Sequence, residues 1–176
     1  NDEELLTETD PYDADSDDDG LNDGDEVNGT GLLAGYGPTD PNDADSDDDG
    51  LNDGLEVGVT VPVPGGNGFT GTDPALFQPD ADPESTTDPT DKDTDNDSLA
   101  DGEEDANGDG ETVNQIGATG TGGSGETDPT EADTDSDTIG DGAELKAHGS
   151  DPLDTDTDDG GVDDGTEIKR GGNPND

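Results

Sequence analysis

One acidic loop pattern recurs along the chain and constrains the fold more than any other feature. It is clearest in residues 13–27, which read DADSDDDGLNDGDEV. Counting Asp15 as position one, aspartates occupy positions one, three and five, a glycine occupies position six and a glutamate position twelve. Alternate residues of a tight loop can direct their oxygens toward one centre, and glycine accepts the positive φ that such a turn requires. The pattern therefore predicts a cation site lined by oxygen.

The same count can be made five times, which gives five loops with the spacing of an EF-hand calcium loop. Position seven would offer a backbone carbonyl, position nine a carboxylate and position twelve both oxygens of a glutamate. The predicted ligands are Asp15, Asp17, Asp19, Leu21, Asp23 and Glu26 in loop one; Asp45, Asp47, Asp49, Leu51, Asp53 and Glu56 in loop two; Asp93, Asp95, Asp97, Leu99, Asp101 and Glu104 in loop three; Asp133, Asp135, Asp137, Ile139, Asp141 and Glu144 in loop four; and Asp156, Asp158, Val162, Asp164 and Glu167 in loop five.

Three loops depart from the pattern. Ser98 and Thr138 stand at position six of loops three and four, and Gly160 stands at position five of loop five. A β-branched residue resists positive φ, so loop four is expected to be strained or slightly re-routed. In loop five a water or a neighbouring carboxylate would have to replace the missing ligand. Loops one and two are therefore the best-matched sites, and loop two is expected to bind more firmly than loop five.

The composition leaves two choices, a disordered polyanion or a fold built around metal. The chain has 53 acidic and 4 basic residues, a net charge of −49 and only 20 % hydrophobic residues. Apolar burial at this level cannot offset about 1–2 kcal/mol of backbone entropy per ordered residue. The fixed spacing of the aspartates favours the second choice. We therefore expect a mostly irregular, calcium-cored repeat array that is elongated, with short helical turns, few or short strands and a minimal hydrophobic core.

A Thr-Asp-Pro or Ser-Asp-Pro tripeptide precedes loops two to five, and Thr9-Asp10-Pro11 precedes loop one. Proline pushes the preceding aspartate into an extended conformation, so each loop is expected to be entered from an extended arm. The predicted division is 1–9, tail of a preceding repeat; 10–27, repeat one; 28–38, insert; 39–57, repeat two; 58–86, insert; 87–104, repeat three; 105–126, insert; 127–145, repeat four; 150–168, repeat five; and 172–176, start of a further repeat.

The inserts are expected mainly to be tolerated surface insertions. Residues 59–63, which read VTVPV, could form an edge strand. Residues 105–110 form a half-loop, D-x-N-x-D-G, that lacks a glutamate at position twelve, and a Gly- and Thr-rich linker follows it. The two ends of the chain look like the end of one repeat and the start of another. We therefore expect a length of a longer array, or head-to-tail association of copies.

The unit T-D-P-x-D-x-D-x-D-x-D-G-L-x-D-G-x-E-V, seen best in residues 9–27 and 39–57, resembles thrombospondin type 3 repeats in their bacterial form. The resemblance implies a chain wrapped around a line of calcium ions, with more than one ion per repeat. Spare carboxylates upstream of the loops could bind these second ions, for a total of about 5 to 11. The candidate second-ion residues are Asp10, Asp13, Asp40, Asp43, Asp88, Asp91, Asp105, Asn107, Asp109, Asp128, Glu131, Asp151 and Asp154.

Several function classes are disfavoured. Paired carboxylates of a glycosidase need a cleft with aromatic and apolar walls, which two Tyr and two Phe cannot build, so no enzymatic activity is expected. The charge would repel nucleic acid and anionic lipid, and no apolar run is long enough for membrane insertion. Asn28 begins a glycosylation sequon, Asn-Gly-Thr.

We expect an extracellular or cell-surface structural module that calcium makes rigid: a stalk, spacer or filament subunit. Weak calcium sites of this type suit calcium levels outside the cell. The expected partners are copies of the chain or neighbouring repeats, with surface polysaccharide as a further candidate. Two alternatives remain open: a calcium-binding linker of a secreted polysaccharide-degrading enzyme, and a calcium buffer or mineral-nucleating protein.

Overall fold

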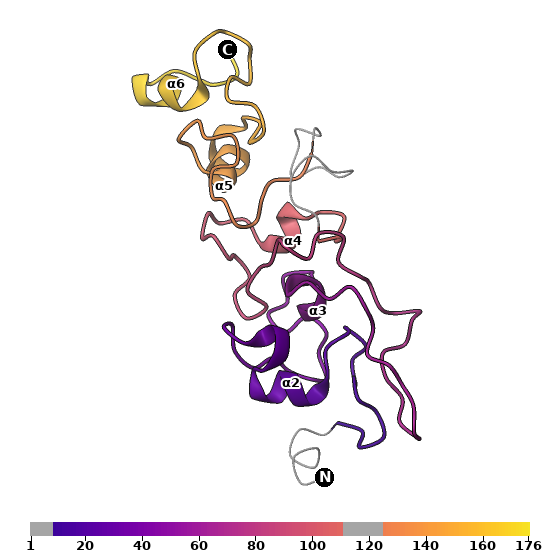
Figure 1. Ribbon diagram of the computed structural model, residues 1–176. Helices are drawn as coiled ribbons and strands as arrows, with labels where there is room; N and C mark the ends of the chain where they lie inside the picture. Colours follow the sequence, from indigo (N-terminus) through magenta and orange to yellow (C-terminus); the bar gives the residue numbers. More distant parts are fainter. Residues whose placement is uncertain (1–8, 111–124) are drawn as a thin grey trace. The chain divides into compact units, whose positions relative to one another are not determined.

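The structure is a computed structural model that describes residues 9–110 and 125–176. Within these residues the backbone is mostly irregular, with short helices and no assigned strand (Figure 1). The expectation of little regular structure is confirmed, and the expected edge strand at residues 59–63 is wrong. Pro62 and Pro64 have no N–H to give to a ladder, and the N–H of Val63 donates to Thr72 Oγ1 at 2.8 Å. The expected N-terminal repeat tail (apart from Thr9) and most of the Gly/Thr linker lie outside the described residues.

A helix begins at position nine of every loop. The glycine at position ten and the shortness of the apolar face keep these helices brief. They are α2 (Asp23–Asn28), α3 (Asp53–Glu56), α4 (Asp101–Glu104), α5 (Asp141–Ala143) and α6 (Asp164–Arg170). A π turn, η2 (Glu144–His148), continues α5, and a 3-10 turn, η1 (Gly31–Leu33), lies in the first insert. Gly29, Gly149 and Gly171 end α2, η2 and α6 in the left-handed region.

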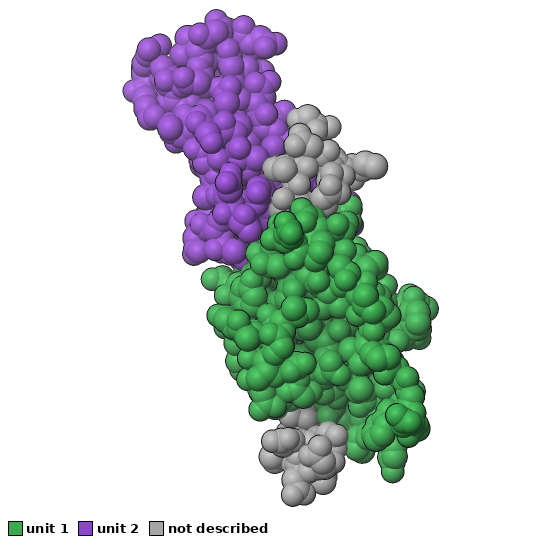
Figure 2. Space-filling model, in the orientation of Figure 1, with its two compact units in different colours: residues 1–92, 109–111 green, residues 93–108, 112–176 purple. Residues whose placement is uncertain are grey.

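The chain forms two compact units, residues 1–92 with 109–111 and residues 93–108 with 112–176 (Figure 2). Unit 1 has a small apolar core to which the inserts contribute, so the expectation of mere surface insertions is wrong there. Leu33 comes from the first insert, and Val59 from the second. The core consists of Leu21, Leu33, Val57 and Val59, with Tyr36 and Phe77 packed against it.

The second insert also returns to loop one. The N–H of Thr70 donates to the carbonyl of Tyr12 at 2.8 Å, and the N–H of Asp73 donates to Asp18 Oδ1 at 2.6 Å. The hydroxyl of Thr72 donates to Asp15, the first residue of the loop. These contacts join residues 55 to 58 positions apart and hold loop one from outside.

Successive repeats contact each other through the glycine at position ten. The N–H of Gly54 donates to Asp19 Oδ2 of loop one at 2.8 Å, and in unit 2 the N–H of Gly165 donates to Asp137 Oδ2 of loop four at 2.6 Å. A Cβ on Gly54 would overlap the carbonyl oxygen of Asp19. Glycine is therefore needed at position ten wherever a preceding loop lies against it.

We predict that Gly54→Ala destabilises the fold and that Gly24→Ala does not. An added Cβ at Gly54 meets backbone, so overpacking should cost about 1–3 kcal/mol. Gly24 is also at position ten, in α2, but a Cβ added there would meet no atom of another described segment within 4 Å, so alanine should be neutral or stabilise the helix by about 0.5–1 kcal/mol. Thermal unfolding in saturating calcium compares the two variants. Equal effects would show that the contact with Asp19 is unimportant.

Candidate metal centres

All five loops follow the same backbone path. Positions four and six have positive φ in every loop, and position six has φ of 101° at Gly20, 87° at Ser98 and 85° at Thr138. Loop four therefore keeps the common path instead of being re-routed, and Thr138 occupies a conformation that costs a β-branched residue free energy. The position-four residues are Asp18, Asp48, Asn96, Ser136 and Asp159, with φ between 58° and 67°.

Backbone N–H groups of the loop hold one oxygen of each of the first three aspartates. In loop one the N–H of Gly20 donates to Asp15 Oδ2 at 3.1 Å, that of Asp19 to Asp17 Oδ1 at 3.4 Å, and that of Leu21 to Asp19 Oδ1 at 2.7 Å. Loops two to four repeat all three bonds, and loop five repeats the first two. The fold thus fixes one oxygen of each carboxylate. The second oxygens of Asp15 and Asp17 accept no such bond, whereas Asp19 Oδ2 accepts the N–H of Gly54 from the next repeat.

Several of these second oxygens, and one oxygen of several position-twelve glutamates, are buried without a hydrogen-bond partner among the residues that the structure describes. In loop one they are Asp15 Oδ1, Asp17 Oδ2 and Glu26 Oε2, and both Asp15 and Glu26 are 0 % exposed. The same positions recur as Asp47 Oδ2, Glu56 Oε2, Asp95 Oδ2, Asp133 Oδ1, Asp135 Oδ2, Glu144 Oε2, Asp156 Oδ1 and Glu167 Oε2. Burial of an uncompensated anionic oxygen is costly. Its recurrence at positions one, three and twelve indicates a shared cause, which a cation at the loop centre would provide.

The carboxylates form compact clusters that could hold a metal ion. One ligand oxygen each from Asp15, Asp17 and Asp19 lies within 4.8 Å of the others. Positions one, three and five form the same cluster in loop two, with Asp45, Asp47 and Asp49, and in loop three, with Asp93, Asp95 and Asp97. The structure therefore brings together the first three predicted ligands of these loops.

A second kind of cluster joins two repeats. Asp19 and Glu26 of loop one meet Asp53, which is position nine of loop two, and all three are buried. The sequence count assigned Asp53 to loop two alone, because counting along one loop says nothing about its neighbour. This cluster lies at the contact that Gly54 makes with Asp19.

Within its own loop the aspartate at position nine binds the residue at position two. Asp53 accepts hydrogen bonds from the N–H of Ser46 at 2.8 Å and from its hydroxyl at 2.7 Å. This pair of bonds occurs in all five loops, as Ser16–Asp23, Ser46–Asp53, Thr94–Asp101, Thr134–Asp141 and Thr157–Asp164. Position nine thus ties the start of the loop to the start of the helix.

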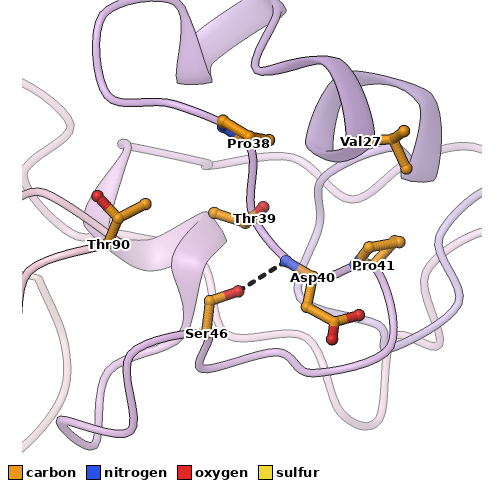
Figure 3. Close-up of a pocket in the computed structure, with 7 residues that line it drawn as sticks. All are labelled: Val27, Pro38, Thr39, Asp40, Pro41, Ser46 and Thr90. Atoms are coloured by element: carbon orange, nitrogen blue, oxygen red, sulfur yellow. Dashed lines mark hydrogen bonds between the residues drawn. The ribbon is translucent and has the colours of Figure 1, made fainter. Parts of the chain in front are cut away.

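The hydroxyl at position two also holds the Asp-Pro lead. Ser46 Oγ accepts the N–H of Asp40 at 2.9 Å (Figure 3). Thr134 and Thr157 accept the equivalent N–H groups in unit 2 at 3.1 and 2.9 Å. Sequence reasoning missed this role, although the signal was present, because position two is Ser or Thr in every loop.

The glutamate at position twelve is oriented by the next repeat. The hydroxyl of Thr39 donates to Glu26 Oε1 at 3.3 Å, and that of Thr87 donates to Glu56 Oε1 at 3.0 Å. Unit 2 has the same contact between Thr127 and Glu104 and between Ser150 and Glu144, at 2.9 Å each. Glu167 of loop five is only partly buried, whereas the other four glutamates at position twelve are buried. The Thr or Ser of each Thr/Ser-Asp-Pro tripeptide therefore orients the glutamate of the preceding loop.

The position-seven residues are buried in loops one to four and partly buried at Val162 of loop five.

The binding of second ions by the carboxylates upstream of the loops stays a prediction. The Asp-Pro aspartates Asp10, Asp40, Asp88, Asp128 and Asp151 each accept the N–H two residues later, at 2.9 to 3.2 Å. Asn107 of the half-loop donates to Glu126, which is 0 % exposed, a contact that the sequence did not predict. Asn28 is exposed, and its amide donates to the carbonyl of Gly24 at 2.8 Å.

Burial, and then the neighbouring carboxylates, raise the pKa of the central acids. The pKa is about 8 for Asp19, about 9 for Glu26 and about 10 for Glu56 in unit 1. In unit 2 it is about 9 for Glu104, where burial is again the larger cause. A bound cation would oppose both causes, since it favours the ionised form.

We predict that the pH dependence of stability reverses when metal binds. Between the ordinary pKa near 4.5 and the raised pKa of about 9, folded metal-free Glu26 holds a proton that the unfolded chain has released. The stability of the metal-free fold should therefore fall as pH rises through this window. With calcium present, protons compete with the ion, so stability should instead fall as pH drops.

Far-UV circular dichroism measures the two slopes: the ordered structure of the metal-stripped chain should increase as pH falls from about 8 to about 5, whereas the melting temperature of the calcium-loaded protein should fall over the same range. Slopes of the same sign in both forms would contradict the assignment of the buried carboxylates to metal binding.

In the parts of the chain that the structure describes, no helix has the length and apolar character needed to cross a membrane. Comparison of the chain with protein-family models, with curated proteins and with solved structures found no match.

Proposed function

We propose that this chain is an extracellular calcium-binding structural module, a stalk or spacer whose repeats fold around calcium ions. The observation that carries the proposal is the recurrence of buried carboxylate oxygens without hydrogen-bond partners at the same loop positions. In a chain with a net charge of −49, such oxygens need a cation in order to remain ionised inside the fold.

The ligand chemistry favours calcium over other metals. The clusters described above consist of carboxylates alone, without His, and the chain contains no Cys. All-oxygen sites suit hard cations, and calcium accepts six to eight oxygens in flexible geometry, whereas magnesium prefers a strict octahedron and keeps several waters. Extracellular calcium modules bind with Kd of about 10⁻⁴–10⁻³ M, which supports a location outside the cell.

A structural role is supported by the way each site meets the next repeat. Asp19 accepts the N–H of Gly54, and Glu26 accepts the hydroxyl of Thr39, so the ligands of loop one also hold repeat two. An ion that fixes these carboxylates therefore also fixes the boundary between repeats. A protein that only buffers calcium would need the carboxylates, but it would not need contacts between each site and the next repeat. The sequence resemblance to thrombospondin type 3 repeats points to the same role.

Calcium should convert the chain from a largely unfolded to a folded state. The apolar core of unit 1 is too small to fold the chain unaided, so far-UV circular dichroism should change strongly when metal-stripped protein receives calcium. Magnesium at the same concentration should have a much smaller effect, and native mass spectrometry should count several bound calcium ions. A spectrum that is the same with and without calcium would refute the proposal.

Glu56→Gln should weaken calcium binding and Glu84→Gln should not. Glu56 is buried at position twelve of loop two, whereas Glu84 is an exposed acid in the second insert, so both variants lose one carboxyl group but only one loses a proposed ligand. Loss of one ion at ten times its Kd corresponds to about 1.4 kcal/mol of stability. Calorimetric calcium titration of the two variants provides the comparison, and equal affinities would remove Glu56 from the site.

A further inference from the structure

Two of the chain's 4 basic side chains lie at boundaries between successive repeats of unit 2. Lys146, on η2 after loop four, donates to the backbone carbonyl of Ser98 in loop three and lies 3.1 Å from Glu103 Oε2. Lys169, on α6 after loop five, donates to the hydroxyl of Thr138 in loop four. Each lysine is two residues after the glutamate at position twelve, and each reaches position six of the preceding loop.

The lysines follow the loops that lack glycine at position six. When position six is glycine, the equivalent place in the next repeat holds a small residue. When it is Ser or Thr, that place holds a lysine. In chain order the four pairs are Gly20 with Gly58, Gly50 with Ala106, Ser98 with Lys146, and Thr138 with Lys169. The two substitutions therefore occur together at both places where either occurs.

The geometry gives a physical reason for this association. Ser98 and Thr138 have φ of 87° and 85°, a region that costs a non-glycine residue free energy. A charged donor to the carbonyl of Ser98 or to the hydroxyl of Thr138 holds position six in that conformation, and charge-assisted hydrogen bonds are among the stronger ones. Lys146 also lowers the pKa of Glu103 through its hydrogen bond, so the ammonium is matched to an acid at the same boundary.

The same boundaries carry the contacts from the glycine at position ten. The N–H of Gly142 donates to Asp97, and the N–H of Gly165 donates to Asp137, one residue before the position-six residue that the lysine contacts. In unit 1 the boundary after loop one has the equivalent contact between Gly54 and Asp19, but there Gly20 lies under the ring of Phe77 and no lysine is present in the pair.

We propose that Lys146 and Lys169 are boundary lysines, which recognise position six of the preceding loop and hold repeats three, four and five in order. The surface around position six of each of these loops is occupied by the next repeat of the same chain. The recognised feature is a Ser or Thr with positive φ at position six. This attachment adds to the metal sites and depends on ionic strength in a different way, because a half-exposed ammonium is screened by monovalent salt.

The test is amide hydrogen exchange by NMR on the whole chain in saturating calcium. Lys146→Met should speed exchange at Gly142 about two- to fivefold, and Lys169→Met should do so at Gly165, as expected for partly exposed charged contacts. Gly54, at a boundary without a lysine, should keep its rate in both variants. Lys92→Met is the matched control, because Lys92 lies 3.9 Å from the exposed Asp48 and, within the described residues, makes no hydrogen bond to position six of a loop.

Two further measurements make the result decisive. Lys146→Arg and Lys169→Arg keep the cation, so they should retain the protection that methionine removes. Raising potassium chloride at fixed calcium should speed exchange at Gly142 and Gly165 of the unchanged protein more than at Gly54. Unchanged rates in both methionine variants, an equal acceleration at Gly54, or arginine variants as fast as the methionine variants would overturn the proposal.

Discussion

The structure depends on carboxylates whose two oxygens have different partners. One oxygen of Asp15 or Asp17 is held by an N–H group of the loop, which sets the position of the side chain. The other is left among like charges, where burial raises the pKa of nearby acids such as Glu26 to about 9. The hydrogen bonds of the chain therefore set the geometry of the loop, but they leave its negative charges uncompensated. A cation bound as proposed would remove this electrostatic repulsion, and metal binding would then be part of folding.

The candidate metal clusters and the boundaries between repeats share residues. Asp19 belongs to the cluster of its own loop, to the cluster with Glu26 and Asp53, and to the contact with Gly54. The small apolar core of unit 1 adds to this arrangement, since the second insert covers Gly20 with Phe77 and donates to Asp15 through Thr72. Polar and apolar contacts therefore meet at loop one, where the proposed metal ligands Asp15 and Glu26 are fully buried.

The sequence predicted what depends on spacing within one loop, and missed what depends on contacts between distant residues. Counting from Asp15 placed the carboxylates that the structure brings together, and short helical turns are confirmed. Counting could not show that Asp53 joins the preceding loop, that Gly54 must lie against Asp19, 35 residues earlier, or that Thr72 reaches Asp15, 57 residues away. The role of Ser46 was accessible in principle, because a hydroxyl residue stands at position two of every loop.

The hydroxyl that orients each position-twelve glutamate gives the chain a polarity. Thr39 acts on Glu26, Thr87 on Glu56 and Ser150 on Glu144, always from the C-terminal side. Neighbouring repeats are consequently unequal partners: the later one helps to build the earlier one's site, and it receives no such hydroxyl in return. Loss of a repeat would therefore remove the hydroxyl from the glutamate of the repeat upstream of it, toward the N-terminus. In the proposed calcium-bound form, a pulling force that separates two repeats would withdraw this hydroxyl from the upstream site, so that calcium release from that site would report the tension.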